Sequence, residues 1–217
     1  MMVSEKQKIG EGVLLMKNVI FDFGQVLVHF SPEYMTKRYV SDEEDARLIS
    51  SVVFDRLYWD RLDDGTITDE EVMAASRMRL PERLWDTADK VYYNWIYNLP
   101  EMEGMRELIL HIKEKYGTRV FLLSNIATYF ADHASEIPII SLLDGCVFSA
   151  ACGRVKPNAD IYEHLCEKFG ILPGESLFVD DRAENIAGAR AVGMDGYLFD
   201  GDAQKLRAYL DGLLLRN

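Results

Sequence analysis

The sequence lacks a long apolar run near its start, a surplus of basic residues and any closely spaced pair of cysteines. Its 217 residues include only three cysteines (Cys146, Cys152 and Cys166), with no CxxC motif. Three such cysteines cannot all pair, which fits a reducing compartment, so we expect a cytoplasmic protein. The first fifteen residues hold no long apolar core, and we find neither a signal peptide nor a transmembrane segment.

The charge balance limits the partners that we expect. There are 24 Lys and Arg residues against 36 Asp and Glu residues, for a formal net charge of −12. Nucleic acids and anionic membrane surfaces both demand basic patches, so we expect neither as a partner. An anionic substrate would need local attraction from one or two lysines or from a bound cation. Nothing in the sequence indicates an oligomeric state.

Five short apolar segments have the character of buried strands. They are residues 18–23, 119–124, 145–150, 176–180 and 195–199. From the second strand onward they alternate with helical patterns, such as the apolar spacing over residues 105–112 and 161–169. Gly170 follows the latter where a left-handed helix cap is expected. Apolar strands alternating with helices predict an α/β fold with a doubly wound parallel sheet.

About ninety-five residues separate the first two predicted strands, far more than a single crossover needs. Most of this gap has helical character. The segments SDEE (41–44) and TDEE (68–71) both match a capping box. An amphipathic pattern over residues 84–95 is followed by Pro100, which cannot continue a helix.

These patterns divide the chain into two parts. We predict a helical cap domain at residues 32–99, inserted just after the first strand. The remaining segments, residues 1–31 and 100–217, then form the core that carries the sheet. Within the first of these, residues 1–16 precede any apolar strand and are interpreted as a flexible leader.

Polar residues stand at or just after the predicted strand ends. They are Asp22, Ser124, Asn125, Lys156, Asp180, Asp181 and Asn185. In an open parallel sheet, ligands bind beyond these carboxyl ends. Three converging carboxylates repel one another unless a cation lies among them, and Mg²⁺ prefers oxygen ligands. We therefore predict a Mg²⁺ site formed by Asp22, Asp181 and the backbone carbonyl of Gly24, where the chain would turn sharply. Asp180 is a second candidate ligand, and Asn185 a supporting residue.

The same strand ends predict a pocket for a phosphoryl group. Lys156 would add a positive charge, and Ser124 and Asn125 would add polar contacts to the phosphate. The Asp22 carboxylate would attack phosphorus and form an aspartyl-phosphate, a covalent intermediate that carboxylates can form. Mg²⁺ and Lys156 would balance the charge of the transferring group before water hydrolyses the intermediate.

Four of these stretches, in this order, resemble the motifs of the haloacid dehalogenase-like hydrolase superfamily. They are Asp22 in FDFG, Ser124 in LLSN, Lys156 in VKP, and Asp181 with Asn185 in DDRAEN. The resemblance implies a Rossmann-like core, a Mg²⁺ cofactor, mostly phosphatase activity and a small helical cap. Within the cap, residues 60–71 (DRLDDGTITDEE) are similar to a segment of bacterial sugar-phosphate phosphatases, including a hexose-1-phosphate phosphatase.

One position departs from the family pattern. Most phosphatases of this family carry a second aspartate two residues after the nucleophile, which protonates the leaving oxygen and later activates water. Here that position is Gly24. General acid–base help of this kind contributes roughly 10²–10⁴-fold. Either another group or a water replaces it, or the enzyme is slow, or the substrate has a good leaving group such as an anomeric sugar oxygen.

The sequence thus favours a Mg²⁺-dependent phosphatase of a small phosphorylated metabolite, for which we expect a sugar phosphate. One alternative is a metal-independent 2-haloacid dehalogenase, which also uses an aspartate nucleophile and lacks the second aspartate. The charged pair at residues 180 and 181 argues against it, because a cation would then be missing. Another alternative is a catalytically weak binding protein on the same scaffold.

Three further features have a structural and a functional interpretation. Residues 60–71 superficially resemble a calcium loop but lack its alternating acidic ligands, so we interpret them as a turn and a helix start. His29 follows the predicted nucleophile and would be an acid–base group only if it reached the pocket. Tyr58 and Trp59 are expected to pack the cap core rather than to contact substrate.

Overall fold

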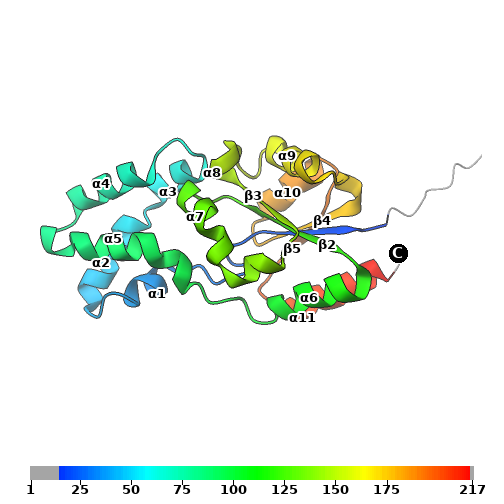
Figure 1. The fold of residues 1–217 in the computed structure, drawn as a ribbon, viewed down its shortest axis with the longest axis horizontal. Helices are drawn as coiled ribbons and strands as arrows, with labels where there is room; N and C mark the ends of the chain where they lie inside the picture. The colour runs from blue at the N-terminus through cyan, green and yellow to red at the C-terminus, as the bar shows by residue number, and fades with distance from the viewer. Residues whose placement is uncertain (1–14, 216–217) are drawn as a thin grey trace, which may run out of the picture.

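A computed structural model describes residues 15–215 of the chain. Five parallel strands form one sheet in the order β3-β2-β1-β4-β5. They are β1 (Asn18–Phe21), β2 (Arg119–Ser124), β3 (Gly145–Phe148), β4 (Ser176–Asp180) and β5 (Asp195–Leu198). All five predicted strands are present, and the first strand of the chain lies at the centre of the sheet (Figure 1).

Helices cover both faces of the sheet, as a doubly wound fold requires. Val19 belongs to the hydrophobic cluster under α6 (Met105–Tyr116) and α11 (Ala203–Leu214). The next residue, Ile20, belongs to the cluster under α9 (Ala159–Phe169) and α10 (Ala183–Ala191) on the opposite face. This alternation confirms the predicted α/β architecture. The shorter elements of this part are α7 (Thr128–His133), η3 (Ala134–Glu136), η4 (Pro138–Leu142), α8 (Ser149–Cys152) and η5 (Pro173–Glu175).

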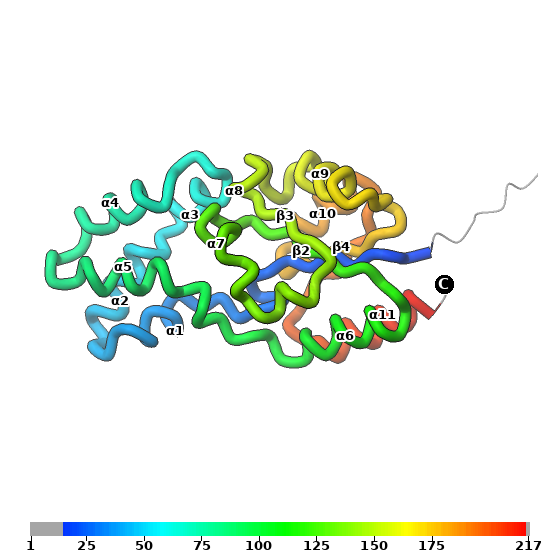
Figure 2. The backbone as a smooth tube through the Cα atoms, in the orientation of Figure 1, coloured from blue at the N-terminus to red at the C-terminus, as the bar shows by residue number. Residues whose placement is uncertain are grey.

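The long segment between β1 and β2 is helical. It contains α1 (Pro32–Lys37), α2 (Glu43–Val53), α3 (Arg56–Asp63), α4 (Asp69–Arg79), η1 (Glu82–Leu84), α5 (Trp85–Asn94) and η2 (Trp95–Asn98). These helices gather at one end of the molecule, on the side toward which β1 runs (Figures 1 and 2). Their side chains share one hydrophobic cluster with the sheet, in which Trp95 stacks on Phe130 of α7 at 5.7 Å between ring centroids. The division into core and cap stays a prediction.

The helix ends confirm one of the two predicted capping boxes and contradict the other. The expected capping box at Thr68 is present: the Thr68 amide donates to Glu71 at 2.9 Å and the Glu71 amide donates to Thr68 at 3.2 Å. The box expected at Ser41 is wrong, because Asp42 is the N-cap and accepts amides of the first turn at 3.0 and 2.9 Å. A charged carboxylate is the stronger acceptor for those amides. The α-helix expected to extend to Trp95 ends at Asn94, where a 3₁₀ turn follows.

The expected leader, residues 1–16, lies almost entirely outside the described residues. Its last residue, Met16, is buried in the core rather than free of it. All three cysteines are free thiols. None of the helices formed by residues 15–215 has the length and apolar character needed to cross a membrane.

Gly188 of α10 allows the helix to approach the loop that precedes α9. A Cβ atom there would lie 2.3 Å from the carbonyl oxygen of Pro157, whereas a Cβ at the exposed Gly212 would meet nothing within 4 Å. We expect Gly188→Ala to lower the free energy of unfolding by about 1–3 kcal/mol. The matched Gly212→Ala should raise it by up to about 1 kcal/mol, since alanine favours helix. Urea unfolding checks both, and equal stabilities would contradict the close approach.

Candidate active site

The carboxyl ends of three neighbouring strands bring the predicted polar residues to one rim. Asp22 directly follows β1, and its backbone amide donates to the carbonyl of Val179 in β4 at 2.9 Å. Ser124 is the last residue of β2, and Asp180 is the last residue of β4. Because β1 lies between β2 and β4, its carboxylate stands between the other two strand ends.

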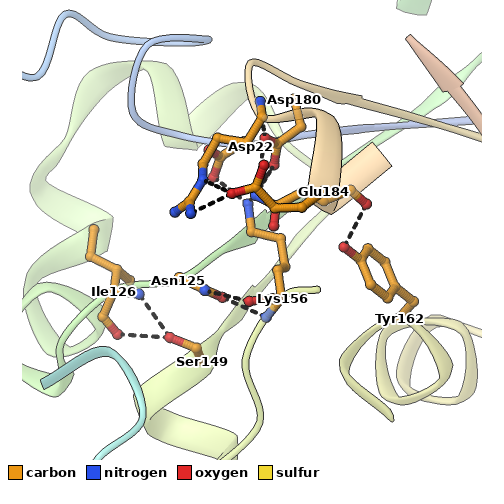
Figure 3. Close-up of polar contacts among 10 residues, drawn as sticks. Asp22, Asn125, Ile126, Ser149, Lys156, Tyr162, Asp180 and Glu184 are labelled. Atoms are coloured by element: carbon orange, nitrogen blue, oxygen red, sulfur yellow. Dashed lines mark hydrogen bonds and ion pairs between the residues drawn. The ribbon is translucent and has the colours of Figure 1, made fainter. Parts of the chain in front are cut away.

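Lys156 is held between two of the carboxylates. Its Nζ lies 2.7 Å from Asp22 Oδ1 and 2.8 Å from Asp180 Oδ2. Figure 3 shows the lysine side chain directed at both acids. Burial alone would lower the pKa of Lys156, but Asp22 and Asp180 raise it above its usual value. The ammonium group is therefore charged, and it is the positive centre of the rim.

Asn125 fixes the backbone that carries this lysine. Its Oδ1 accepts the Lys156 amide at 2.8 Å, and its Nδ2 donates to the Lys156 carbonyl at 3.0 Å. The next residue, Ile126, donates its amide to Ser149 Oγ at 2.8 Å (Figure 3). Both polar atoms of Asn125 are thus engaged by the lysine loop. Asn125 therefore positions the lysine loop, and because its Nδ2 carries a second hydrogen, the expected phosphate contact stays a prediction.

Asp180 and Asp181 face different surroundings. Asp180 is fully buried, and its oxygens accept the Arg182 amide at 2.8 Å and Asn185 Nδ2 at 3.1 and 3.0 Å. Asp181 is exposed and lines the cavity at the rim. The carboxylate open to the cavity is therefore that of Asp181, and its role as a metal ligand stays a prediction. Asp180 instead holds Lys156 and Asn185 in place.

The three carboxylates form a cluster suited to a cation. Asp22, Asp180 and Asp181 each offer an oxygen atom, and these atoms lie within 4.8 Å of one another. Lys156 balances only one of the three charges. Burial, opposed by Lys156 and assisted by Asp180, raises the pKa of Asp22 to about 6, and burial with Asp180 raises that of Asp181. A hard cation with oxygen ligands would relieve this repulsion, so the donor set fits Mg²⁺.

Gly24 lies on the cavity wall, but the sharp turn is not made there. The left-handed residue is Gln25, with φ of 60°, and Gln25 Nε2 donates to the Phe30 carbonyl at 2.9 Å. The expectation that Gly24 supplies the turn is therefore wrong. A Cβ at Gly24 would meet Phe30 Cβ at 3.7 Å, an ordinary contact. Nothing in the backbone therefore forbids a side chain at this position.

A cavity of about 270 Å³ opens above the rim, between the strand ends and the inserted helices. Its upper wall is aromatic, formed by Phe30, Trp59 and Trp95, whose rings lie 5.4–5.5 Å apart. Trp59 Nε1 donates to the Val53 carbonyl at 2.8 Å, and the Trp59 ring is inclined by 59° to that of Phe30 and by 62° to that of Trp95. Trp59 therefore combines the two interpretations, packing and cavity lining. Tyr58 is not among the lining residues.

Sequence reasoning missed three charged residues of the cavity wall, Arg56, Asp63 and Arg182, and proposed one residue that lies elsewhere. Arg56 and Asp63, at the two ends of α3, both line the cavity. Asp63 belongs to the acidic pair before Gly65, which the sequence indicated only as a turn. His29 is exposed, lies outside the cavity lining and donates its amide to the Pro100 carbonyl at 2.8 Å.

Removing the buried lysine should destabilise the protein. Lys156→Met leaves Asp22 and Asp180 buried without their cation, and breaking such a pair costs about 3–5 kcal/mol. Asp22 would then hold a proton at higher pH, so its ionisation would oppose folding as the pH rises. We expect Lys156→Met to lower the free energy of unfolding more at pH 8 than at pH 5, as measured by urea unfolding without metal. The exposed Lys90→Met is the control and should change stability by less than about 0.5 kcal/mol; a similarly small effect of Lys156→Met would refute the pairing.

Known proteins share this arrangement of elements. A family model described as haloacid dehalogenase-like hydrolase matches residues 16–193. The chain is 28% identical over 183 residues to a sesquiterpene phosphatase of Aspergillus oryzae, covering 83% of this chain and 88% of the relative. It is 24% identical over 199 residues to D-ribitol-5-phosphate phosphatase of Bacteroides thetaiotaomicron, covering 84% and 91%.

Among solved structures, a HAD-like family hydrolase from Porphyromonas gingivalis superposes with a TM-score of 0.68 at 26% identity, covering 94% of this chain and 99% of that one. The match to the family model extends over most of the chain and includes every strand end that forms the rim. The chain therefore belongs to the haloacid dehalogenase-like hydrolase family.

Proposed function

We propose that the protein is a Mg²⁺-dependent phosphatase of a small phosphorylated metabolite, acting through an aspartyl-phosphate on Asp22. The observation that carries this proposal is the placement of Lys156 between Asp22 and Asp180, beside the cavity-lining Asp181. One lysine among three carboxylates leaves a net negative rim that a divalent cation would balance. With such a cation bound, the cation and Lys156 would offer positive charge to the oxygens of a phosphoryl group.

The residues that would hold the metal are Asp22, Asp181 and the backbone carbonyl of Gly24. When bound, Mg²⁺ would neutralise charge on the phosphoryl oxygens. Lys156 then orients the phosphoryl group with its ammonium charge, since its loop is fixed by Asn125. Ser124 is buried at the end of β2 and lines the cavity, where its hydroxyl meets the bound phosphate.

The nucleophile is the carboxylate of Asp22. Its oxygen attacks phosphorus, the bond from phosphorus to the ester oxygen breaks, and the ester oxygen leaves with the electron pair. Water then attacks the aspartyl-phosphate and releases inorganic phosphate together with the free Asp22 carboxylate. Most of the rate advantage comes from positioning and charge stabilisation, which the rigid rim supplies.

The substrate class follows from the cavity. Its size admits a small organic group beyond the phosphate, and its upper wall offers aromatic faces on which a sugar ring can pack. Two relatives are named a sesquiterpene phosphatase and a D-ribitol-5-phosphate phosphatase. A sugar phosphate is the substrate we propose. The cytoplasmic location and the absence of nucleic-acid and membrane partners stay predictions.

A 2-haloacid dehalogenase would use the same nucleophile without a metal. The reaction of a dehalogenase would not use Asp181, which is exposed beside Asp22. The two carboxylates repel each other, so the pair calls for a cation. A binding protein without turnover would need neither a buried lysine nor an ordered nucleophile. The charge arrangement therefore favours the phosphatase.

Metal removal separates the phosphatase from the dehalogenase. We expect release of inorganic phosphate from a panel of phosphorylated sugars to stop on addition of EDTA and to return with Mg²⁺. Asp181→Asn should raise the Mg²⁺ concentration required for half-maximal phosphate release. Added Mg²⁺ should also raise the unfolding temperature of this variant less than that of the wild type. Chloride release from 2-chloropropionate that persists in EDTA would overturn the assignment in favour of the dehalogenase.

Substitution of the nucleophile tests the covalent step. Asp22→Asn removes the attacking carboxylate, and we expect the phosphatase rate to fall on the order of 10⁴-fold. Acid quenching of the wild-type enzyme with substrate should yield a phosphorylated peptide containing Asp22, detected by mass spectrometry and absent from the variant. Asp200→Asn, at an exposed aspartate paired with Lys205, is the control and should leave the rate unchanged. An active Asp22→Asn enzyme would rule out this nucleophile.

A further inference from the structure

Asp63 is an acidic residue of the cavity wall that the fold itself does not explain. It is the last residue of α3 and lines the same cavity as Asp22 and Gly24. Its Oδ1 atom is buried and meets no hydrogen-bond donor among residues 15–215. The neighbouring cation, Arg56, is engaged by Asp60 at 2.9 Å instead. A buried carboxyl oxygen without a partner costs stability, so its retention calls for another use.

The turn after α3 holds Asp63 over the rim. Gly65 adopts a left-handed conformation with φ of 75°, and a Cβ there would lie only 3.2 Å from the Ala150 carbonyl of α8. The turn is closed locally, since the Thr66 amide donates to Asp64 Oδ1 at 2.9 Å. This close approach seats the end of α3 on the element that leads to Lys156. Asp63 thus lies at the packed end of α3, in the wall of the cavity that Asp22 also lines.

Gly24 leaves the rim without an acid–base group. It has no side chain to protonate a leaving oxygen, and His29 lies outside the cavity. We propose that Asp63, contributed by the inserted helices, is the general acid and base of the reaction in place of a side chain at position 24. This assignment rests on the proposed phosphatase function and adds to it the group that carries the proton.

The proton affinity of Asp63 suits this role. Burial raises its pKa to about 7; Arg56 and Lys156 oppose the shift, while Asp60 and Asp22 add to it. The remaining charged groups near this part of the wall are the exposed Arg182 and the adjacent Asp64. A bound phosphoryl dianion would raise the pKa further by like-charge repulsion. Asp63 therefore carries a proton near neutral pH, where general acids are most effective.

The proton balance closes over the two steps. As Asp22 forms its bond to phosphorus, the leaving oxygen takes the bond's electron pair and the Asp63 proton, which releases an alcohol. The resulting Asp63 carboxylate accepts a proton from water as the water oxygen attacks the aspartyl-phosphate. The bond between phosphorus and Asp22 breaks, phosphate leaves, and Asp63 is protonated again.

The test compares two esters of similar size with Asp63→Asn. Benzyl phosphate releases a strongly basic alkoxide that needs a proton, whereas 4-nitrophenyl phosphate releases a stable phenolate. We expect the rate with benzyl phosphate to fall about 10²–10⁴-fold. With 4-nitrophenyl phosphate, phosphorylation of Asp22 should persist while water attack slows. The variant should therefore give a burst of one nitrophenolate per enzyme and accumulate the phosphorylated protein.

Further variants separate this role from a structural one. Asp64→Asn keeps the acceptor oxygen of the turn and should match the wild type with both esters. Gly24→Asp in the Asp63→Asn background places a carboxyl where a Cβ fits and should restore part of the benzyl phosphate rate. In the wild type, the benzyl phosphate rate should fall above about pH 7, as Asp63 loses its proton. That fall should be absent in Asp63→Asn.

The outcomes distinguish this assignment from the function on which it rests. The role of Asp63 alone would be overturned if the wild type is active but Asp63→Asn shows no burst. In that case the variant's rates with the two esters would fall by the same factor or would not fall at all. A wild type inert toward both esters and the sugar phosphates would overturn the phosphatase proposal and this role with it. Unfolding temperature verifies folding: because a raised carboxyl pKa destabilises the folded state once the group ionises, Asp63→Asn should melt above the wild type at pH 8.

Discussion

The buried contact of Lys156 with Asp22 and Asp180 is the constraint on which the rest of the site depends. A lysine and two aspartates taken out of water are costly unless every charge is paired and hydrogen-bonded. Here Asn185 and the Arg182 amide complete the shell of Asp180, and Asn125 fixes the lysine backbone. Because Asp22 and Asp180 follow adjacent strands, the contact also locks β1 and β4 at their carboxyl ends.

This shell decides which carboxylate remains available. Asp180 uses both oxygens inside the protein, while Asp181, one residue later, turns outward to the cavity. Alternation along an extended chain sends consecutive side chains to opposite sides. The two aspartates therefore differ in their contacts: Asp180 pairs with Lys156 inside the protein, and Asp181 is open to a ligand. The surplus negative charge of the rim is a direct result.

The sequence was a good guide to this rim and a poor guide to what lies above it. Apolar strands ending in Asp22, Ser124 and Asp180 predict the carboxyl edge, because parallel strands end at the same side. The sharp turn after the first strand was expected at Gly24, yet the left-handed residue is Gln25. The role proposed for Asp63 was not predictable, since its place in the cavity wall depends on the packing of α3 against α8, far along the chain. Local patterns define elements, whereas cavities arise from contacts between them.

The two sides of the cavity come from different parts of the chain, and this bears on how the reaction is timed. Asp22 follows β1 and Lys156 lies in the loop before α9, whereas Asp63, Trp59 and Trp95 lie in the helical segment between β1 and β2. Gly65, two residues after Asp63, lies close to the Ala150 carbonyl, and this contact joins the end of α3 to α8. Under the proposed role of Asp63, proton transfer would depend on how the end of α3 packs against α8, because a shift of this contact would change the distance between Asp63 and Asp22.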